Sequence, residues 1–246
     1  MDAYGGHGGF SCRGGVSLIK FENTEVWGFE HAIRGMRNPM NSWCKSDSGY
    51  KHCASVDCSD CNEGKHFEIG ENDKALMKQL VKAGSSHRKF LRQIFVSVDI
   101  TAPLYWFKEY DTYKVGTVAN STSTMHKLTS KPFEKKDFSF EKLEGMMDGW
   151  IEARLDELND IRDCYVNYDQ YMADGEFTEP IDKKELWYML VQMLPSSYNQ
   201  KRTVTMTYEN LLNMYEQRKG HKLDEWGEFC SWILRLPYSE LLEVND

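Results

Sequence analysis

Apolar and polar positions alternate most clearly between residues 94 and 100. The apolar set on one face is Ile94, Val96, Val98 and Ile100. Such alternation is typical of a β-strand with one buried face. Pro103 follows, at a place that suits the first turn of a helix, and residues 104–114 are rich in aromatic side chains. The pattern therefore predicts a strand and a helix in succession, followed by a hydroxyl-rich loop over residues 115–126.

The remaining hydrophobic periodicities predict further strands and helices on both sides of this pair. Strands are expected over 16–21 and 202–207. The first helix is expected to be capped by Asn23 or Thr24 and to end near residue 37, and an irregular stretch follows over 43–66. Further helices are expected over 71–83, 138–172, 182–194, 209–218 and 224–236. No internal repeat interrupts this order. The chain is therefore expected to adopt an α/β (α+β) fold.

Composition narrows the class of protein. The chain has 246 residues, of which 41% are hydrophobic, enough for a sizeable core. Its net charge of −8 argues against binding to a nucleic-acid polymer. We find no apolar run that suits a membrane span and no signal peptide, and the odd count of 7 Cys favours reduced thiols. The sequence thus predicts a cytoplasmic protein without a membrane partner.

A cysteine-rich stretch stands out before the main strand. Cys53, Cys58 and Cys61, with His66, could supply four ligands to Zn²⁺, but only one C-x2-C pair is present. A variable surface insertion is the favoured interpretation, so no metal site is predicted. This stretch, a Gly-rich start expected to be flexible and the first helix make up an N-terminal segment over 1–66. Residues 67–246 are expected to form the core, with the whole chain as one domain.

Cationic residues gather at two places. His87, Arg88, Lys89 and Arg92 precede the main strand, and Arg218 lies near the end of an apolar helix. Such residues commonly form a solvated strand end or a favourable helix C-terminus. They can equally converge in space on one anionic ligand, and the spacing alone leaves both interpretations open.

The segment VDITAPLYWFKEYDTYKVGTVANST, residues 98–122, resembles the central motif of flavin-dependent thymidylate synthases. In that family an Ala-Pro step leads into a helix that ends R-H-R, followed after seven residues by Ser. Aligning Ala102-Pro103 without gaps places Thr112, Tyr113 and Lys114 on R-H-R and Thr122 on the Ser. A second segment, NLLNMYEQR, is similar to the family's S-L-M-N-F-L-x-L-R, and Asn213 and Arg218 keep its five-residue separation.

The resemblance implies a mixed sheet with long flanking helices, homotetramers with flavin sites between subunits, and FAD-dependent one-carbon transfer to C5 of dUMP. The carbon donor would be methylenetetrahydrofolate, and NADPH a possible reductant. It implies that Arg218 is essential to catalysis. Cofactor contacts would come from Thr112, Tyr113, Lys114 and Asn213. His87 and Arg88 of the basic patch are further candidates, because they could replace the charge that the altered motif lacks. Nucleotide contacts would come from Glu109, Asn120, Ser121, Thr122, Ser123, His126 and Arg218.

Two departures from the family's pattern affect the expected activity. Of the R-H-R positions only Lys114 keeps a fixed charge, and Lys lacks the bidentate fork of Arg. The family's nucleotide-contacting Gln falls on Glu109, whose charge would repel a phosphate. A dCMP-directed methylase or hydroxymethylase, and a nucleotide-binding relative without catalysis, therefore remain alternatives.

Overall fold

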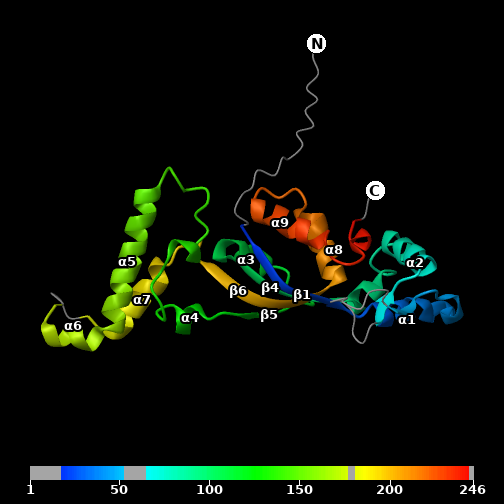
Figure 1. The fold of residues 1–246 in the computed structure, drawn as a ribbon, viewed down its shortest axis with the longest axis horizontal. Helices are drawn as coiled ribbons and strands as arrows, with labels where there is room; N and C mark the ends of the chain where they lie inside the picture. The colour runs from blue at the N-terminus through cyan, green and yellow to red at the C-terminus, as the bar shows by residue number, and fades with distance from the viewer. Residues whose placement is uncertain (1–17, 53–64, 177–180, 244–246) are drawn as a thin grey trace, which may run out of the picture.

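The computed structural model describes residues 18–52, 65–176 and 181–243 (Figure 1). A four-stranded sheet occupies its centre. The strands are β1 (Lys20–Trp27), β4 (Phe95–Pro103), β6 (Asn199–Thr207) and β5 (Val118–Ser121), in the order β1-β4-β6-β5. All three pairings are antiparallel. The expected α+β class is confirmed, and its main strand, β4, lies in the interior of the sheet.

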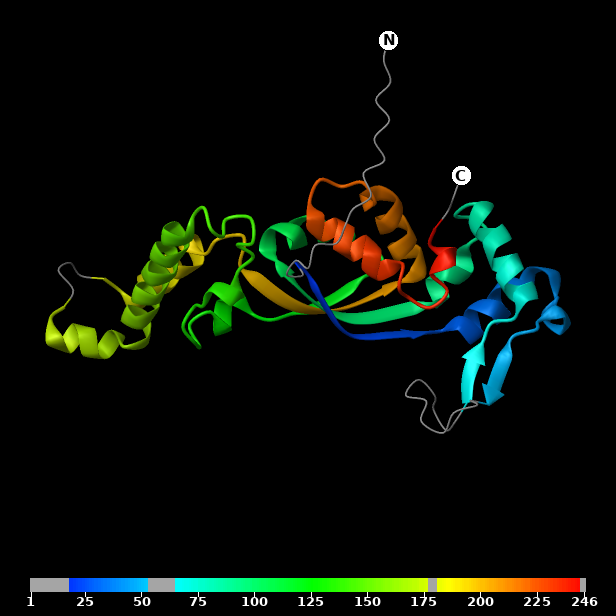
Figure 2. The same ribbon diagram turned by 45° about the horizontal axis from the view of Figure 1, so that its top comes forward.

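Alternation along β4 determines which face of the sheet is covered. Val96, Val98 and Ile100 are fully buried, and Val98 lies opposite Val204 of β6. Three helices pack on this face: α3 (Leu104–Tyr110), α8 (Tyr208–Arg218) and α9 (Asp224–Ile233). Figure 2 shows these helices on one side of the sheet, with no described helix across the central strands on the other side.

The aromatic residues of α3 form the centre of the main core. The Trp106 ring lies 5.1 Å from Tyr110, 4.8 Å from Trp226 and 5.6 Å from Phe229, measured between ring centroids. All four side chains are buried. Aromatic pairs at these separations contribute about 0.5–1.5 kcal/mol beyond the area that they bury. The cluster therefore holds α3 against α9 through direct ring contacts.

Helical extensions lie at the two ends of the sheet (Figure 1). At one end are α1 (Phe29–Arg37), α2 (Glu71–Lys82) and a hairpin of β2 (Gly49–His52) and β3 (Lys65–Glu68). At the other end are α4 (Thr124–Lys127), α5 (Asp148–Val166), α6 (Tyr168–Asp174) and α7 (Lys183–Met193). A second apolar cluster, which includes Phe138, Leu158 and Leu190, joins α5 to α7. Among the described residues, no helix combines the length and apolar character needed to cross a bilayer.

The predicted boundaries near the N-terminus are wrong. The first strand is β1, and Asn23 and Thr24 lie inside it rather than at a helix cap. Asn23 adopts φ 51° at a shift in the strand register, and its side-chain amide donates to Asp99. Helix α1 begins only after Gly28, whose φ is 99°. Asn and Gly tolerate this left-handed conformation, so a short polar run that resembles a helix cap instead forms a bulge.

Three other expectations also differ from the structure. The helix expected over 138–172 begins only at residue 148, because Phe138 pairs with Tyr198 and packs in the second cluster. It is also divided at Asn167 into α5 and α6. The stretch over 43–66, expected to be irregular, contributes the hairpin strands. The hydroxyl-rich stretch contains β5, which satisfies the backbone groups along one edge of β6.

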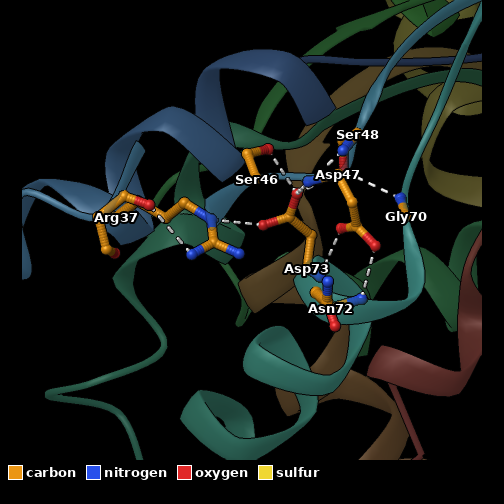
Figure 3. Close-up of polar contacts among 8 residues, drawn as sticks. Arg37, Ser46, Asp47, Ser48, Gly70, Asn72 and Asp73 are labelled. Carbon is orange, nitrogen blue, oxygen red and sulfur yellow. Dashed lines mark hydrogen bonds and ion pairs between the residues drawn. The ribbon is translucent and has the colours of Figure 1, made fainter. Parts of the chain in front are cut away.

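A buried ion pair joins the end of α1 to the first turn of α2, and hydroxyl groups from the segment before the hairpin complete it (Figure 3). Arg37 donates through Nε to Asp73 Oδ1 at 2.6 Å. The Ser46 and Ser48 hydroxyls donate to Asp73 Oδ2 at 2.6 and 2.7 Å. Asp47 in turn accepts hydrogen bonds from the backbone N–H groups of Asn72 and Asp73, which satisfies donors at the start of α2.

The environment of Asp73 lowers the pKa of its carboxyl group. Burial alone would raise the pKa of Asp73, but the hydrogen bonds from Ser46, Ser48 and Arg37 and the Arg37 charge outweigh burial, so the pKa falls below its usual value. A lowered native pKa contributes stability above the unfolded pKa of about 3.9. That contribution disappears as the pH falls through the native pKa.

We predict that Asp73→Asn lowers the free energy of unfolding by about 3 kcal/mol, because it leaves the Arg37 charge buried without its partner. Denaturant unfolding at pH 7 measures this loss. Between pH 7 and 3 the variant should also lose less stability than the parent. Glu71→Gln, which removes an exposed carboxylate paired with Lys74 on the same helix, is the control and should change stability by less than about 0.5 kcal/mol. Equal effects of the two substitutions would contradict this account.

Candidate functional site

The pairing of β4 with β6 determines where helices α3 and α8 meet. Pro103 at the end of β4 pairs with Asn199, and Thr207 at the end of β6 pairs with Phe95. Helices α3 and α8 therefore start at opposite ends of the sheet and fold back over the same face. Their C-terminal ends meet above the sheet, where Glu109 of α3 contacts Arg218, the last residue of α8.

Glu109 is the centre of the first polar cluster. Its Oε2 accepts from Arg218 Nη1 at 2.8 Å and from Trp226 Nε1 at 3.1 Å. His221 Nε2 lies 3.3 Å from the same oxygen. Three nitrogen atoms from α8, α9 and the turn between them thus converge on one carboxylate oxygen.

The Arg218 guanidinium is held on several sides. Its Nε donates to the Tyr113 hydroxyl at 2.8 Å, and that hydroxyl donates to Gln217 Oε1 at 3.0 Å. The Arg218 Cζ atom lies 4.6 Å from the Trp226 ring centroid, within the range of a cation–π contact. The charged end of Arg218 is therefore fixed in orientation before any ligand arrives.

A second polar cluster lies on another flank of α8. Arg88 Nη2 donates to Asn213 Oδ1 at 3.0 Å, and Arg88 Nε lies 3.5 Å from Glu209 Oε1. Arg92 Nε donates to Oε2 of the same Glu209. Two guanidinium groups thus share one carboxylate, which leaves a net positive charge. Among the described residues, the buried Arg88 Nε has no hydrogen-bond partner.

The two clusters are separated by the geometry of α8. Asn213 and Arg218 are five residues apart, which corresponds to about 7.5 Å along the helix axis and roughly 140° around it. The two residues therefore point from different faces of α8, and a single phosphate group cannot contact both clusters.

Residues 112–114, which match the R-H-R motif, have separate environments. Tyr113 belongs to the Arg218 cluster. The Thr112 hydroxyl donates to the Glu109 carbonyl at 2.7 Å, at the end of α3. Lys114 is exposed, and the described residues include no partner for its ammonium group. His87 is exposed as well, in the turn after α2, with its backbone N–H bonded to Gly84.

The hydroxyl-rich residues are directed to the edge of the sheet. Asn120 and Ser121 belong to β5 and pair with Thr203 and Arg202. The Thr122 backbone N–H donates to the Lys201 carbonyl at 2.9 Å. The Ser123 hydroxyl accepts from the His126 backbone N–H at 3.0 Å and caps α4. These contacts pair the segment with β6 and cap α4. None of them joins the segment to the Arg218 cluster.

Sequence reasoning gave no site role to His221, Trp226 or Glu209. Glu209 precedes Asn213 by four residues, a spacing that places both on one helix face and was available as a signal. His221 and Trp226 carry no comparable signal, because the turn between α8 and α9 brings them to Glu109. The metal candidates Cys53, Cys58 and Cys61 lie outside the described residues. The part that is described, His66 included, contains no group of His, Cys, Asp and Glu suited to a metal ion.

No protein-family model and no curated protein sequence matches this chain. Solved structures are similar. Flavin-dependent thymidylate synthase ThyX from Helicobacter pylori, complexed with FAD and dUMP, superposes with a TM-score of 0.60 over 92% of this chain and 97% of that chain, at 14% identity. A second structure of that enzyme with FAD and dUMP gives a TM-score of 0.58 over 91% and 94%, also at 14% identity. The chain shares its fold with this enzyme.

We predict that Arg218→Met lowers the free energy of unfolding by about 2 kcal/mol, because Glu109 and Tyr113 lose their charged partner. Met keeps much of the apolar contact with Trp226. Thermal and denaturant unfolding measure the loss. Lys219→Met, at the next and exposed position, is the matched control and should stay within about 0.5 kcal/mol of the parent. If Arg218→Met is as stable as this control, the interactions of Arg218 do not contribute to the stability of the folded protein.

Proposed function

We propose that this protein is a flavin-dependent transferase that adds a one-carbon unit to C5 of a pyrimidine deoxynucleotide. The observation that carries the proposal is the fold likeness, which extends over nearly the full length of an enzyme solved with FAD and dUMP. It is supported by the position of Arg218, which the family motif identified and which lies in a polar cluster with Tyr113 and Trp226.

An anionic cofactor such as FAD fits the residues of the second cluster. Arg88 and Arg92 bring two positive charges against the single carboxylate of Glu209. A phosphate is the type of anion that pairs with such an excess of positive charge. Arg88 and Asn213 would therefore hold the cofactor's phosphates, with Lys114 as an exposed additional cation.

The residues of the first cluster would bind and orient the nucleotide. Arg218 supplies hydrogen-bond donors, while Trp226 and Tyr113 hold its guanidinium plane and exclude water from one side. Bound FAD, reduced by NADPH, would supply hydride, and methylenetetrahydrofolate would supply the carbon. The protein's own contribution is then positioning and electrostatics.

We also propose that the protein works as a homotetramer. The face of the sheet opposite α3, α8 and α9 carries no described helix across its central strands. On that face the Trp27 and Phe95 rings stack with centroids 5.8 Å apart, and they are 44% and 37% exposed. Exposed aromatic pairs of this kind are enriched at protein interfaces.

The test of the function has two steps. The purified protein is first examined for flavin absorbance, then incubated with FAD, NADPH, methylenetetrahydrofolate and dUMP or dCMP, with the mass of the nucleotide followed over time. A gain of one carbon on either base supports the proposal. Nucleotide binding without flavin binding or product supports a relative that retains the fold but lacks the chemistry, and the absence of both rejects the proposal.

We predict that Arg88→Met weakens FAD binding by about 10- to 100-fold, because one charge-assisted bond to a phosphate contributes about 1.5–3 kcal/mol. Fluorescence titration of FAD measures the change. Lys89→Met removes a neighbouring exposed cation and is expected to alter the affinity by less than threefold. A loss of equal size in both variants would show that general surface charge, rather than the Arg88 contact, attracts the cofactor.

A further inference from the structure

The hydrogen bonds of Glu109 are distributed unevenly between its two oxygens. Oε2 accepts hydrogen bonds from Arg218 and Trp226 and lies near His221 Nε2. Oε1 has no hydrogen-bond partner among the described residues, and the side chain is 34% exposed. Glu109 therefore presents one open acceptor beside Arg218, because an ionised carboxylate accepts hydrogen bonds and donates none.

Arg218 presents open donors next to that acceptor. A guanidinium carries five N–H groups. Within the described chain, Arg218 uses one N–H for the Tyr113 hydroxyl and one for Glu109. The remaining donors have no acceptor among the described residues, and the side chain is 17% exposed. Glu109 and Arg218 together thus offer an acceptor followed by donors.

The charge of this pair argues against a phosphate as its ligand. The carboxylate lies 2.8 Å from the guanidinium and cancels its charge. A phosphate placed on Arg218 would meet the repulsion of Glu109 at close range. A neutral group with a donor and adjacent acceptors meets no such repulsion.

Resting on the proposed function, we propose that Glu109 and Arg218 read the edge of the base and select cytosine, so that the nucleotide substrate is dCMP. Cytosine presents an amine donor at N4 and acceptors at N3 and O2. The N4 amine would donate to Glu109 Oε1, in the manner in which carboxylates read cytosine in nucleic acids. The Arg218 donors would bind N3 and O2. The pair would thus offer the acceptor–donor–donor order that guanine offers to cytosine.

Uracil fits this arrangement less well. Its edge presents the O4 acceptor, the N3–H donor and the O2 acceptor. If uracil binds in the position in which cytosine places N4 at Glu109, its O4 atom lies against the carboxylate. If the base shifts so that N3–H donates to Glu109, one of the two neighbouring carbonyl groups lies beside the same negative charge. A glutamine at this position can donate through its amide, which removes that penalty.

Calorimetric titration of dCMP and dUMP into the full chain, with FAD present, tests the inference. The parent is expected to bind dCMP about tenfold more tightly than dUMP, and Glu109→Gln is expected to abolish or reverse that preference. Glu109→Asp keeps the carboxylate and should keep the sign of the preference. Glu216→Gln, an exposed carboxylate on α8, is the matched control and should leave the ratio of affinities unchanged.

The outcomes separate this inference from the function on which it rests. Equal or tighter binding of dUMP by the parent, with the same ratio in Glu109→Gln, overturns the selection of cytosine and leaves the proposed transferase standing. Binding of neither nucleotide by the folded parent overturns both. A parent preference for dCMP that only Glu109→Gln removes supports the inference, and circular dichroism establishes that each variant is folded.

Discussion

The antiparallel pairing of β4 with β6 is the constraint on which the rest of the arrangement depends. It sends α3 and α8 back over one face of the sheet from opposite ends, so that their C-terminal ends converge. Helix C-termini carry partial negative charge, and a carboxylate at such a junction is unfavourable without a cation. Arg218 supplies that cation, and the rings of Trp226 and Tyr113 fix its position.

The two flanks of α8 differ in charge and therefore suit different chemical groups. On one flank, two arginines against one carboxylate leave a positive charge, which suits an anion. On the other flank, Glu109 cancels the charge of Arg218, which suits a neutral polar edge. An anionic group on the first flank and a neutral base edge on the second would satisfy both.

Local patterns predict the elements that depend on local physics. The alternation at 94–100 identified the main strand, and the helix expected over 209–218 placed Asn213 and Arg218 on what is α8. The contacts of Glu109 were not predictable, because Arg218, His221 and Trp226 reach it only through tertiary packing. The hydroxyl-rich stretch was misread as a loop because its pairing partner, β6, lies about eighty residues away in the sequence. The bulge at Asn23 was misread because short polar residues favour caps and turns alike.

A crystal structure of the protein with bound dCMP tests the central claim most directly, because it shows which part of the nucleotide meets the junction of α3 and α8. The account predicts the N4 amine of the base within hydrogen-bond distance of Glu109 and the N3 and O2 atoms facing Arg218. A nucleotide whose phosphate lies on Arg218, with Glu109 turned away, would contradict it.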